Sequence, residues 1–323
     1  MQFLLCSLLA AAAFAQTLPG DRVIASDVAV GSLSYSADGV DIAGLCLDGK
    51  VRFWDARTGS LKRAVPFDKE DRVTLHGRAG AAAAAAGDGS VRIYDLKTGE
   101  VVRRLTGATS TVRTIVFSPD RKMFAGASRL RADGSENAVR TWDASGAAKL
   151  SLPAGLGGIS AMAFSPDGGA IVAAGYDTDI RAWSTRNGEL LRLMDDLPLS
   201  TFAMAFSPDG KYLATGGADR VVYLWDTKTW RIARKLTGQP ELIYSLAFSP
   251  DGRLLVSGGA SELTFRNPAK ALFWDVATGK PVRSVTTPHL VTSAAFSPDG
   301  TRLATSSEQT ISIWAVPAAS PRP

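Results

Sequence analysis

FSPDG, residues 206–210, is the stretch that decides the fold, because close copies of it recur along the chain. Ser-Pro-Asp-Gly favours a type I turn: Pro fixes φ at the second position, and Gly accepts the positive φ that closes a hairpin. The other copies, including FSPDR at residue 117 and YSADG at residue 35, begin at Tyr35, Phe117, Phe164, Phe248 and Phe296. Each copy predicts a tight turn between two strands.

The copies keep a regular spacing. With His76 taken as a degenerate copy, successive copies lie 41, 41, 47, 42, 42 and 48 residues apart. Each is followed 18 to 26 residues later by an aromatic residue, and these are Trp54, Tyr94, Trp142, Trp183, Trp225, Trp274 and Trp314. A repeat of this length indicates a propeller or solenoid, and seven units fill the chain.

The runs beside each turn predict strands. STFAMAF, KYLATGG and VVYLWD are short, rich in β-forming residues and bounded by Gly, Asp or Pro. Residues 81–86 are all Ala and favour helix in isolation, but they fall in phase with the small-residue strands of other units, so a strand is expected there too.

On these repeats, the chain resembles the WD-repeat β-propeller family from about residue 21 to residue 316. The resemblance implies an all-β, seven-bladed propeller of four-stranded antiparallel blades, with strands a to d counted outward from the axis. FSPDG would be the a–b turn and the aromatic residue would lie on strand c. Residues 16–323 would form this single domain, as a monomer.

The two ends of the chain predict how the ring closes. The C-terminal AVPAASPRP contains three prolines and cannot supply an outer strand for the last blade. DRVIAS, residues 21–26, has the same phase relative to Tyr35 as VVRRL has relative to Phe117. We expect it to complete blade seven and so remove the exposed sheet edges.

One family feature is missing. Members often carry a His before strand a, hydrogen-bonded with a loop Asp, a strand Ser or Thr, and the Trp. Here only His289 lies near such a position. Four aspartates look like loop members of the network without a His partner: Asp48, Asp88, Asp177 and Asp219.

Two units are longer than the rest. The turn and the aromatic residue are 18 or 19 residues apart in five units, but 25 apart in unit three and 26 in unit six. We expect the extra residues in the b–c loops, on one face and nearly opposite each other across the channel. Binding residues often lie on such loops. The alternative is a neutral insertion, because a longer loop adds little to the entropy cost of loop closure. The candidate contact residues are Arg129, Arg131, Asp133, Glu136, Glu262, Phe265, Arg266 and Lys270.

Trp230 is a further candidate contact residue. Other units end the c–d turn with Gly, as in WDARTG, whereas unit five reads WDTKTW. A bulky residue at a position of positive φ is an outlier, so either the turn differs or strain is tolerated. We expect Trp230 on the face opposite the b–c loops, packed over a neighbouring turn.

The N-terminus predicts export. MQFLLCSLLAAAAFAQ is apolar and ends in Ala-Phe-Ala, so a signal peptide of residues 1–15, cleaved after Ala15, is expected. A buried N-terminal strand or helix is the alternative. The segment is too short to span a membrane. Cys46 would then be the only cysteine left, as a small buried residue. A periplasmic or secreted, bacterial protein fits these features.

The charge pattern and the motifs narrow the function. The net charge of +5 is scattered, which argues against nucleic-acid binding. No metal, nucleophile or phosphate-loop motif is present, so no catalytic residue, metal or cofactor is predicted. Asp177-Thr178-Asp179 lacks the spacing of a calcium loop, as does the 133–136 cluster. We expect a non-catalytic scaffold for another protein or a cell-envelope component. The alternative is a propeller hydrolase or lactonase with carboxylates and a metal at the channel mouth.

Overall fold

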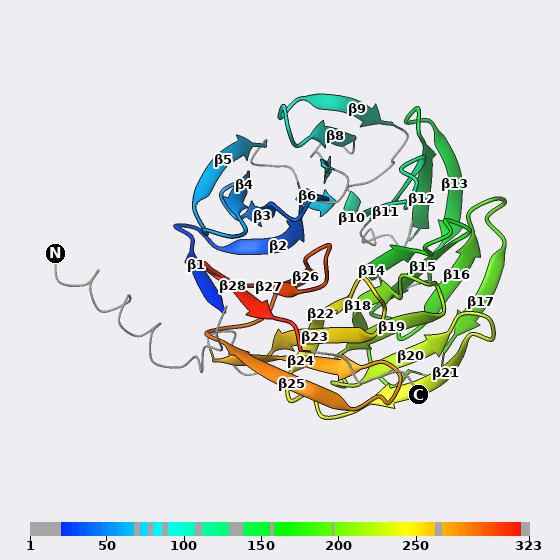
Figure 1. Ribbon diagram of the computed structural model, residues 1–323. Coiled ribbons are helices and arrows are strands. Elements are labelled where there is room, and N and C mark those ends of the chain that lie inside the picture. Colours follow the sequence, from blue (N-terminus) through cyan, green and yellow to red (C-terminus); the bar gives the residue numbers. More distant parts are fainter. Residues whose placement is uncertain are drawn as a thin grey trace.

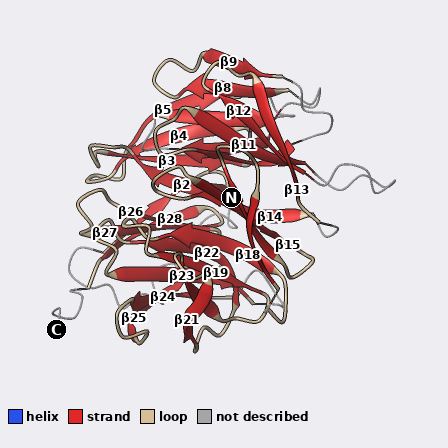
Figure 2. Ribbon diagram, turned by 90° about the vertical axis from the view of Figure 1, so that its right-hand side faces the viewer, coloured by secondary structure: helices blue, strands red, loops and turns tan. Residues whose placement is uncertain are grey.

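The structure, a computed structural model, describes residues 21–317 apart from 68–71, 77–79, 86–89, 107–111, 129–137, 156–157, 196 and 262–266. Within these ranges the chain is all-β, with no helix (Figure 2). Seven four-stranded antiparallel sheets stand around a central channel (Figure 1). The predicted seven-bladed propeller is confirmed.

Each blade takes its strands in the order a, b, c, d from the channel outward. Blade one comprises β2 (Val30–Tyr35), β3 (Asp41–Cys46), β4 (Lys50–Asp55) and β5 (Leu61–Pro66); blade two β6 (Arg72–His76), β7 (Ala81–Ala85), β8 (Val91–Asp95) and β9 (Val101–Leu105); blade three β10 (Val112–Phe117), β11 (Met123–Ser128), β12 (Ala138–Asp143) and β13 (Ala148–Pro153); blade four β14 (Ile159–Phe164), β15 (Ala170–Gly175), β16 (Ile180–Ser184) and β17 (Leu190–Met194). Blade five comprises β18 (Thr201–Phe206), β19 (Tyr212–Gly217), β20 (Val222–Asp226) and β21 (Arg231–Leu236); blade six β22 (Leu242–Phe248), β23 (Leu254–Ala260), β24 (Ala269–Asp275) and β25 (Pro281–Thr287); blade seven β26 (Ser293–Phe296), β27 (Arg302–Ser307), β28 (Thr310–Ala315) and β1 (Arg22–Ala25).

The FSPDG copies form the a–b turns, as predicted. In blade four the N–H of Gly168 donates to the Ser165 carbonyl over 2.8 Å, and Gly168 has a φ of 71°. The Ser165 hydroxyl donates to Asp167 Oδ1 over 2.5 Å and accepts from the N–H of Ala170 over 2.9 Å. The Ser165 hydroxyl and the N–H of Gly169 lower the pKa of Asp167. The same Ser-to-Asp hydrogen bond caps the a–b turns of blades one, three, five, six and seven.

The strand-c aromatics form the core between blades. Trp142, Trp225 and Trp274 are at most 1% exposed. Trp274 of blade six packs in one cluster with Leu224 and Leu236 of blade five, so the indole joins neighbouring sheets. Sheet-to-sheet packing of this kind is the main favourable term in a fold that has no disulfide in the described part of the chain.

Strand β1 closes the ring, as predicted. It pairs antiparallel with β28, from Arg22 opposite Ile313 to Ala25 opposite Thr310. Asp21, just before β1, adds a clasp that the sequence did not predict. Its carboxylate accepts from the N–H of Ala315 over 2.9 Å and from Arg283 Nη2 over 3.2 Å, and its side chain is 1% exposed.

Arginines on strand d also tie neighbouring blades together. Their guanidinium groups donate to a backbone carbonyl at or just after the end of strand c of the next blade. The pairs are Arg22 with Arg57, Arg63 with Leu96, Arg234 with Val276, and Arg283 with Ala315. These hydrogen bonds link neighbouring blades at the end of the propeller that carries the a–b and c–d turns.

Candidate functional site

The turns divide the molecule into two faces. Because neighbouring strands are antiparallel, the b–c turns and d–a connections lie at one end of the blades, here called the upper face. The a–b and c–d turns lie at the other end, the lower face. The b–c connections of blades three and six therefore leave from the upper face, as predicted.

Most of the predicted contact residues fall outside the residues that the structure describes. These are Arg129, Arg131, Asp133 and Glu136 of blade three, and Glu262, Phe265 and Arg266 of blade six. The prediction that Lys270 lies in the b–c loop of blade six is wrong. Lys270 is the second residue of strand β24, opposite Thr286, and not part of the loop, although its side chain is exposed.

Blade six uses part of its insertion to lengthen strands. Strands β23, β24 and β25 each have 7 residues, against 5 or 6 for the corresponding strands of blade five. The longer hairpin raises the start of β24 towards the upper face. The length difference in the sequence therefore marks a taller blade as well as a longer loop.

The structure adds a row of aromatic side chains on the upper face. The rings of Phe202 and Tyr244 are stacked, with centroids 5.2 Å apart and an interplanar angle of 8°. The Tyr176 ring follows at 6.1 Å from Phe202. Tyr176 is 61% exposed. Leu199, in the connection that leads from blade four to blade five, is 49% exposed. Tyr176, Phe202 and Tyr244, the aromatic row, span blades four to six.

A β-bulge places two of these rings. The pairing of β18 with β19 shifts register between Thr201 and Ala203, and that of β22 with β23 shifts between Ile243 and Ser245. Phe202 and Tyr244 are therefore the extra, unpaired residues of innermost strands. Bulges commonly re-aim a side chain at the rim of a barrel-like fold.

The same position can be found in every repeat, four residues before the turn motif. Its occupants in blades one to seven are Gly31, Arg72, Arg113, Ser160, Phe202, Tyr244 and Thr292. Blades one, three and four also carry the register shift there. The residue type changes from blade to blade while the backbone position is kept. Aligning the repeats by this position would have found Phe202 and Tyr244 of the aromatic row from the sequence.

The b–c turn aspartates are held by other partners in place of His. Asp48 accepts from Arg52 Nη1 over 2.8 Å, and Asp219 accepts from the Tyr223 hydroxyl over 2.7 Å. The hydrogen bonds from Arg52 lower the pKa of Asp48. Asp88 lies outside the described residues. The partner residue sits two positions before the strand-c aromatic, so it reaches the turn from within the sheet.

The pair Asp177 and Asp179 also has a partner. Both carboxylates bind Arg181, over 2.8 and 2.6 Å. Within the described ranges, no group of three or more His, Cys, Asp or Glu side chains is placed to hold a metal ion.

Blade six contains a buried polar network with Gln in the place of His. Trp274 Nε1 donates to the Ser257 hydroxyl over 2.8 Å, and that hydroxyl donates to Gln239 Oε1 over 2.7 Å. Gln239 Nε2 donates to Glu241 Oε2 over 2.8 Å, and the N–H of Lys270 donates to Glu241 Oε1 over 3.2 Å. Burial raises the pKa of Glu241. Both oxygens of this carboxylate are thus bonded inside the blade.

His289 lies against the b–c turn of blade seven. Its N–H donates to the Ser307 hydroxyl over 3.0 Å, while Trp314 Nε1 donates to Thr305. Its Nε2 lies 3.6 Å from a Glu308 carboxylate oxygen.

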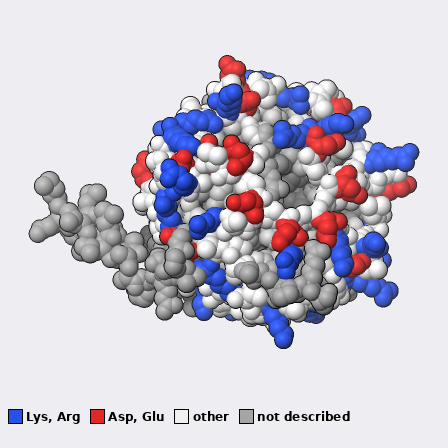
Figure 3. All heavy atoms as spheres, in the orientation of Figure 1, with Lys and Arg blue, Asp and Glu red and all other residues white. Residues whose placement is uncertain are grey.

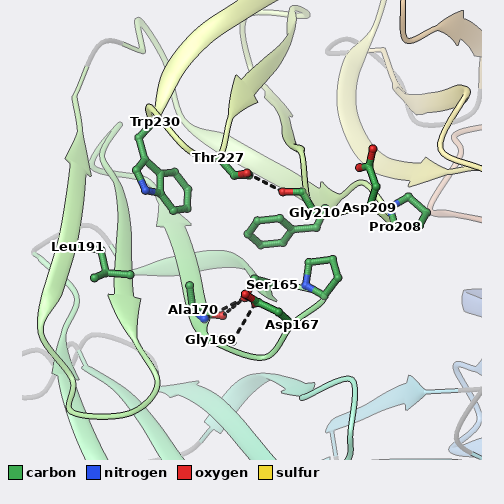
Figure 4. A pocket seen from close by; sticks show the side chains of 12 residues that line it. Ser165, Asp167, Gly169, Ala170, Leu191, Pro208, Asp209, Gly210, Thr227 and Trp230 are labelled. Atoms are coloured by element: carbon green, nitrogen blue, oxygen red, sulfur yellow. Dashed lines mark hydrogen bonds between the residues drawn. The ribbon is translucent and has the colours of Figure 1, made fainter.

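Trp230 lies on the lower face, as predicted. Its φ is 52°, and its N–H donates to the Asp226 carbonyl over 2.7 Å. Gly59 makes the same bond to Asp55 over 2.8 Å, so the turn type is unchanged and the strain is tolerated. Trp230 lines a groove of about 630 Å³ between blades four and five. Figure 4 shows the indole above Leu191 and across from Pro208.

The charges are unevenly spread around the channel. On the face drawn in Figure 3, Asp and Glu side chains surround the central hollow, while Lys and Arg side chains lie mainly farther out. In the described part of the chain, no helix is long and apolar enough to cross a membrane.

Comparison with known proteins is consistent with this geometry. A family model described as "WD domain, G-beta repeat" matches residues 99–143, 149–184, 200–226, 230–262 and 279–315, more than half of the chain. Telomerase protein component 1 of Rattus norvegicus is 30% identical over 145 residues, which are 44% of this chain and 5% of that protein. WD repeat-containing protein 36 of Homo sapiens is 26% identical over 97 residues, 30% of this chain and 10% of that protein. The chain thus matches only a small part of these relatives.

Proposed function

This chain belongs to the WD domain, G-beta repeat family, and we propose that it is an exported, non-catalytic scaffold that binds another protein or a cell-envelope component through its upper face. WD-repeat propellers are typically protein-interaction scaffolds. Fold alone is an associational argument for function, so the proposal depends on a specific surface.

The aromatic row carries the proposal. Tyr176 is 61% exposed in the b–c turn of blade four, and its ring lies beside the stack of Phe202 on Tyr244, tilted by 55°. Aromatic residues are enriched in the cores of protein interfaces, because they bury a large apolar area at a low entropy cost. The bulges fix the backbone under two of the rings, so a partner would meet a preformed surface.

The aromatic row spans blades four to six, and the two insertions belong to blades three and six. Blade six, which contributes Tyr244, carries the second insertion, and blade three, next to blade four, carries the first. Residues of both loops would flank a partner seated on the row. Arg129, Arg131 and Arg266 could then pair with carboxylates or phosphates of that partner, and Phe265 could add an anchor.

The test is partner capture by tagged variants expressed in the native cell. Replacing Phe202 and Tyr244 together by Ala should reduce the amount of the main partner recovered at least about tenfold, as for interface hot spots. Trp230→Ala, which removes an aromatic side chain from the lower face, is the matched control and should keep the partner. Equal recovery with all three proteins would contradict the use of the upper face.

The loops are tested in the same assay. A variant with Arg129, Arg131, Phe265 and Arg266 all replaced by Ala should recover less partner at an unchanged melting temperature. Undiminished recovery would show that the insertions are not used.

Export needs a separate test. Residues 1–20, which lie outside the described residues, would be fused to a reporter that folds only outside the cytoplasm. We expect reporter activity from the fusion and none after Leu4, Leu5, Leu8 and Leu9 are replaced by Arg, because the apolar segment is what the export machinery recognises. An inactive fusion would favour a scaffold that stays in the cytosol.

A further inference from the structure

The lower face carries a second groove with different chemistry, at the seam where the ring closes. It has a volume of about 670 Å³ and lies between blades seven and one. Tyr35 at the end of strand a lines it, together with Arg22 of β1, Arg57, and Arg302 beside the a–b turn of blade seven. This volume is within the range of ordinary ligand sites.

The groove can be compared residue by residue with the groove beside Trp230. Tyr35 takes the place of Phe206, since both are the aromatic that opens the a–b turn motif. Arg302 takes the place of Ala170, since both lie five residues after the turn serine. Two equivalent positions of the repeat have therefore changed from apolar to polar at the seam.

The Tyr35 hydroxyl has an unmet hydrogen bond. Tyr35 is 3% exposed, and no group in the described ranges bonds to its hydroxyl oxygen. Buried polar groups nearly always have a partner, because an unsatisfied one loses its hydration without compensation. Five other copies of the motif have Phe here, so this hydroxyl is not required by the turn. Burial raises the pKa of Tyr35 far above its usual value, which keeps the hydroxyl protonated as a donor.

The charged side chains leave one positive charge in excess. The groove is lined by three arginines, Arg22, Arg57 and Arg302, and by two aspartates, Asp38 and Asp299. Each aspartate accepts from the serine of its own turn over 2.5 Å, which commits one carboxylate oxygen to the turn. The Arg22 guanidinium donates to the Arg57 carbonyl, so it is fixed at the edge of the groove.

We propose that this groove binds a single carboxylate, which accepts a hydrogen bond from the Tyr35 hydroxyl and pairs with Arg302 and Arg22. One excess positive charge matches a monoanion better than a doubly charged phosphate. A guanidinium and a hydroxyl donor together suit the two oxygens of a carboxylate. The apolar sides of Ala56, Pro298 and Ile313 leave room for the chain that carries the carboxylate. The site is independent of the upper face.

The carboxylate has two sources to distinguish, a free small acid and the end of a peptide. The full chain labelled with ¹³C in its tyrosine rings gives signals from 6 tyrosines. Tyr35→Phe identifies the Tyr35 signal by its loss. Acetate, inorganic phosphate, an N-acetylated Ala-Pro-Ala peptide with a free C-terminus, and the same peptide with an amidated C-terminus are then titrated in turn.

We expect acetate and the free peptide to move the Tyr35 signal saturably, and the amidated peptide to leave it in place. Tighter binding of the peptide than of acetate would assign the site to a peptide terminus; equal binding would assign it to free acids. Arg302→Ala and Arg22→Ala should each weaken binding about tenfold, since each removes a charge-assisted contact.

Arg192→Ala is the matched control. Arg192 stands opposite Ala182, just before Trp183, as Arg22 stands opposite Ile313, just before Trp314. It should leave acetate binding unchanged. A Tyr35 signal that no probe moves would mean that the hydroxyl is bonded only to water, and would overturn the proposal. Equal shifts with phosphate and acetate, or with the two peptides, would overturn the carboxylate assignment.

Discussion

Replacing Asp21 by Ala should destabilise the closed ring, because Asp21 links the closing strand to blades six and seven. The Asp21 side chain is 1% exposed and accepts from the N–H of Ala315 and from Arg283. After the substitution the N–H of Ala315 has no acceptor, while Arg283 keeps its bond to the Ala315 carbonyl. The clasp between blades six and seven and the N-terminal strand is then open.

The expected loss follows from these two contacts. A buried hydrogen bond to a charged acceptor contributes about 1.5–3 kcal/mol. The ion pair with Arg283, whose side chain is 15% exposed, adds at most about 1 kcal/mol. Together they give a loss of about 1.5–4 kcal/mol, or on the order of 5 °C in melting temperature for a chain of this length. Asp21→Asn keeps an acceptor for the Ala315 N–H and should lose about half as much.

Urea unfolding and calorimetry measure this loss. Asp27→Ala is the control: Asp27 lies just after β1, its side chain is 74% exposed, and it pairs with Arg52 at 3.3 Å. Its loss should stay below about 1 kcal/mol, because exposed ion pairs contribute little. If the Asp21 and Asp27 variants unfold at the same urea concentration, the clasp does not hold the ring and the reasoning is refuted.

Three further predictions concern the backbone, the buried carboxylate and the closing strand. Trp230→Gly should be more stable than Trp230→Ala by about 1 kcal/mol, because Ala keeps a Cβ at a φ of 52°; the opposite order in urea unfolding would contradict the strain. Burial raises the folded-state pKa of Glu241 above its unfolded value, so the stability from this group is full at low pH and is lost as pH rises through the folded pKa. The stability of the wild type relative to Glu241→Gln should thus fall from pH 4 to pH 7, and a constant difference would be inconsistent with a raised pKa. Deleting residues 21–26 should lower the melting temperature by at least about 10 °C, since it removes the clasp and a whole strand; an unchanged value would disprove closure by β1.

The repeats made the backbone predictable. Seven copies of one turn and one aromatic position carry the same constraints, so the strands, the turns and the closing role of residues 21–26 followed from their phase. Even the prediction of a strand in the Ala-rich segment, β7 (Ala81–Ala85), is confirmed, because the repeat position outweighs the helix propensity of Ala. The wrong placement of Lys270 shows the limit of this reasoning, since a count of extra residues does not separate a longer loop from longer strands.

The partners of individual side chains were not predictable in the same way. Asp21 and Ala315 are 294 residues apart in sequence, and their contact exists only after the ring has closed. Gln239 takes a place usually held by His, and no pattern of spacing indicates that an amide serves there. The bulges under Phe202 and Tyr244 arise from register, which hydrophobic alternation alone does not fix. The contacts of Asp21 and Gln239 are single occurrences, whereas periodicity detects only what is repeated.

Site-specific photocrosslinking in the native cell tests the central claim most directly. A benzoylphenylalanine residue would replace Phe202 on the upper face or, as a control, Lys97 in the exposed c–d turn of blade two on the lower face. The account predicts one main crosslinked partner from position 202 that is absent from position 97. Crosslinks to that partner from position 97 alone, or no crosslink from position 202, would contradict a scaffold that binds through its upper face.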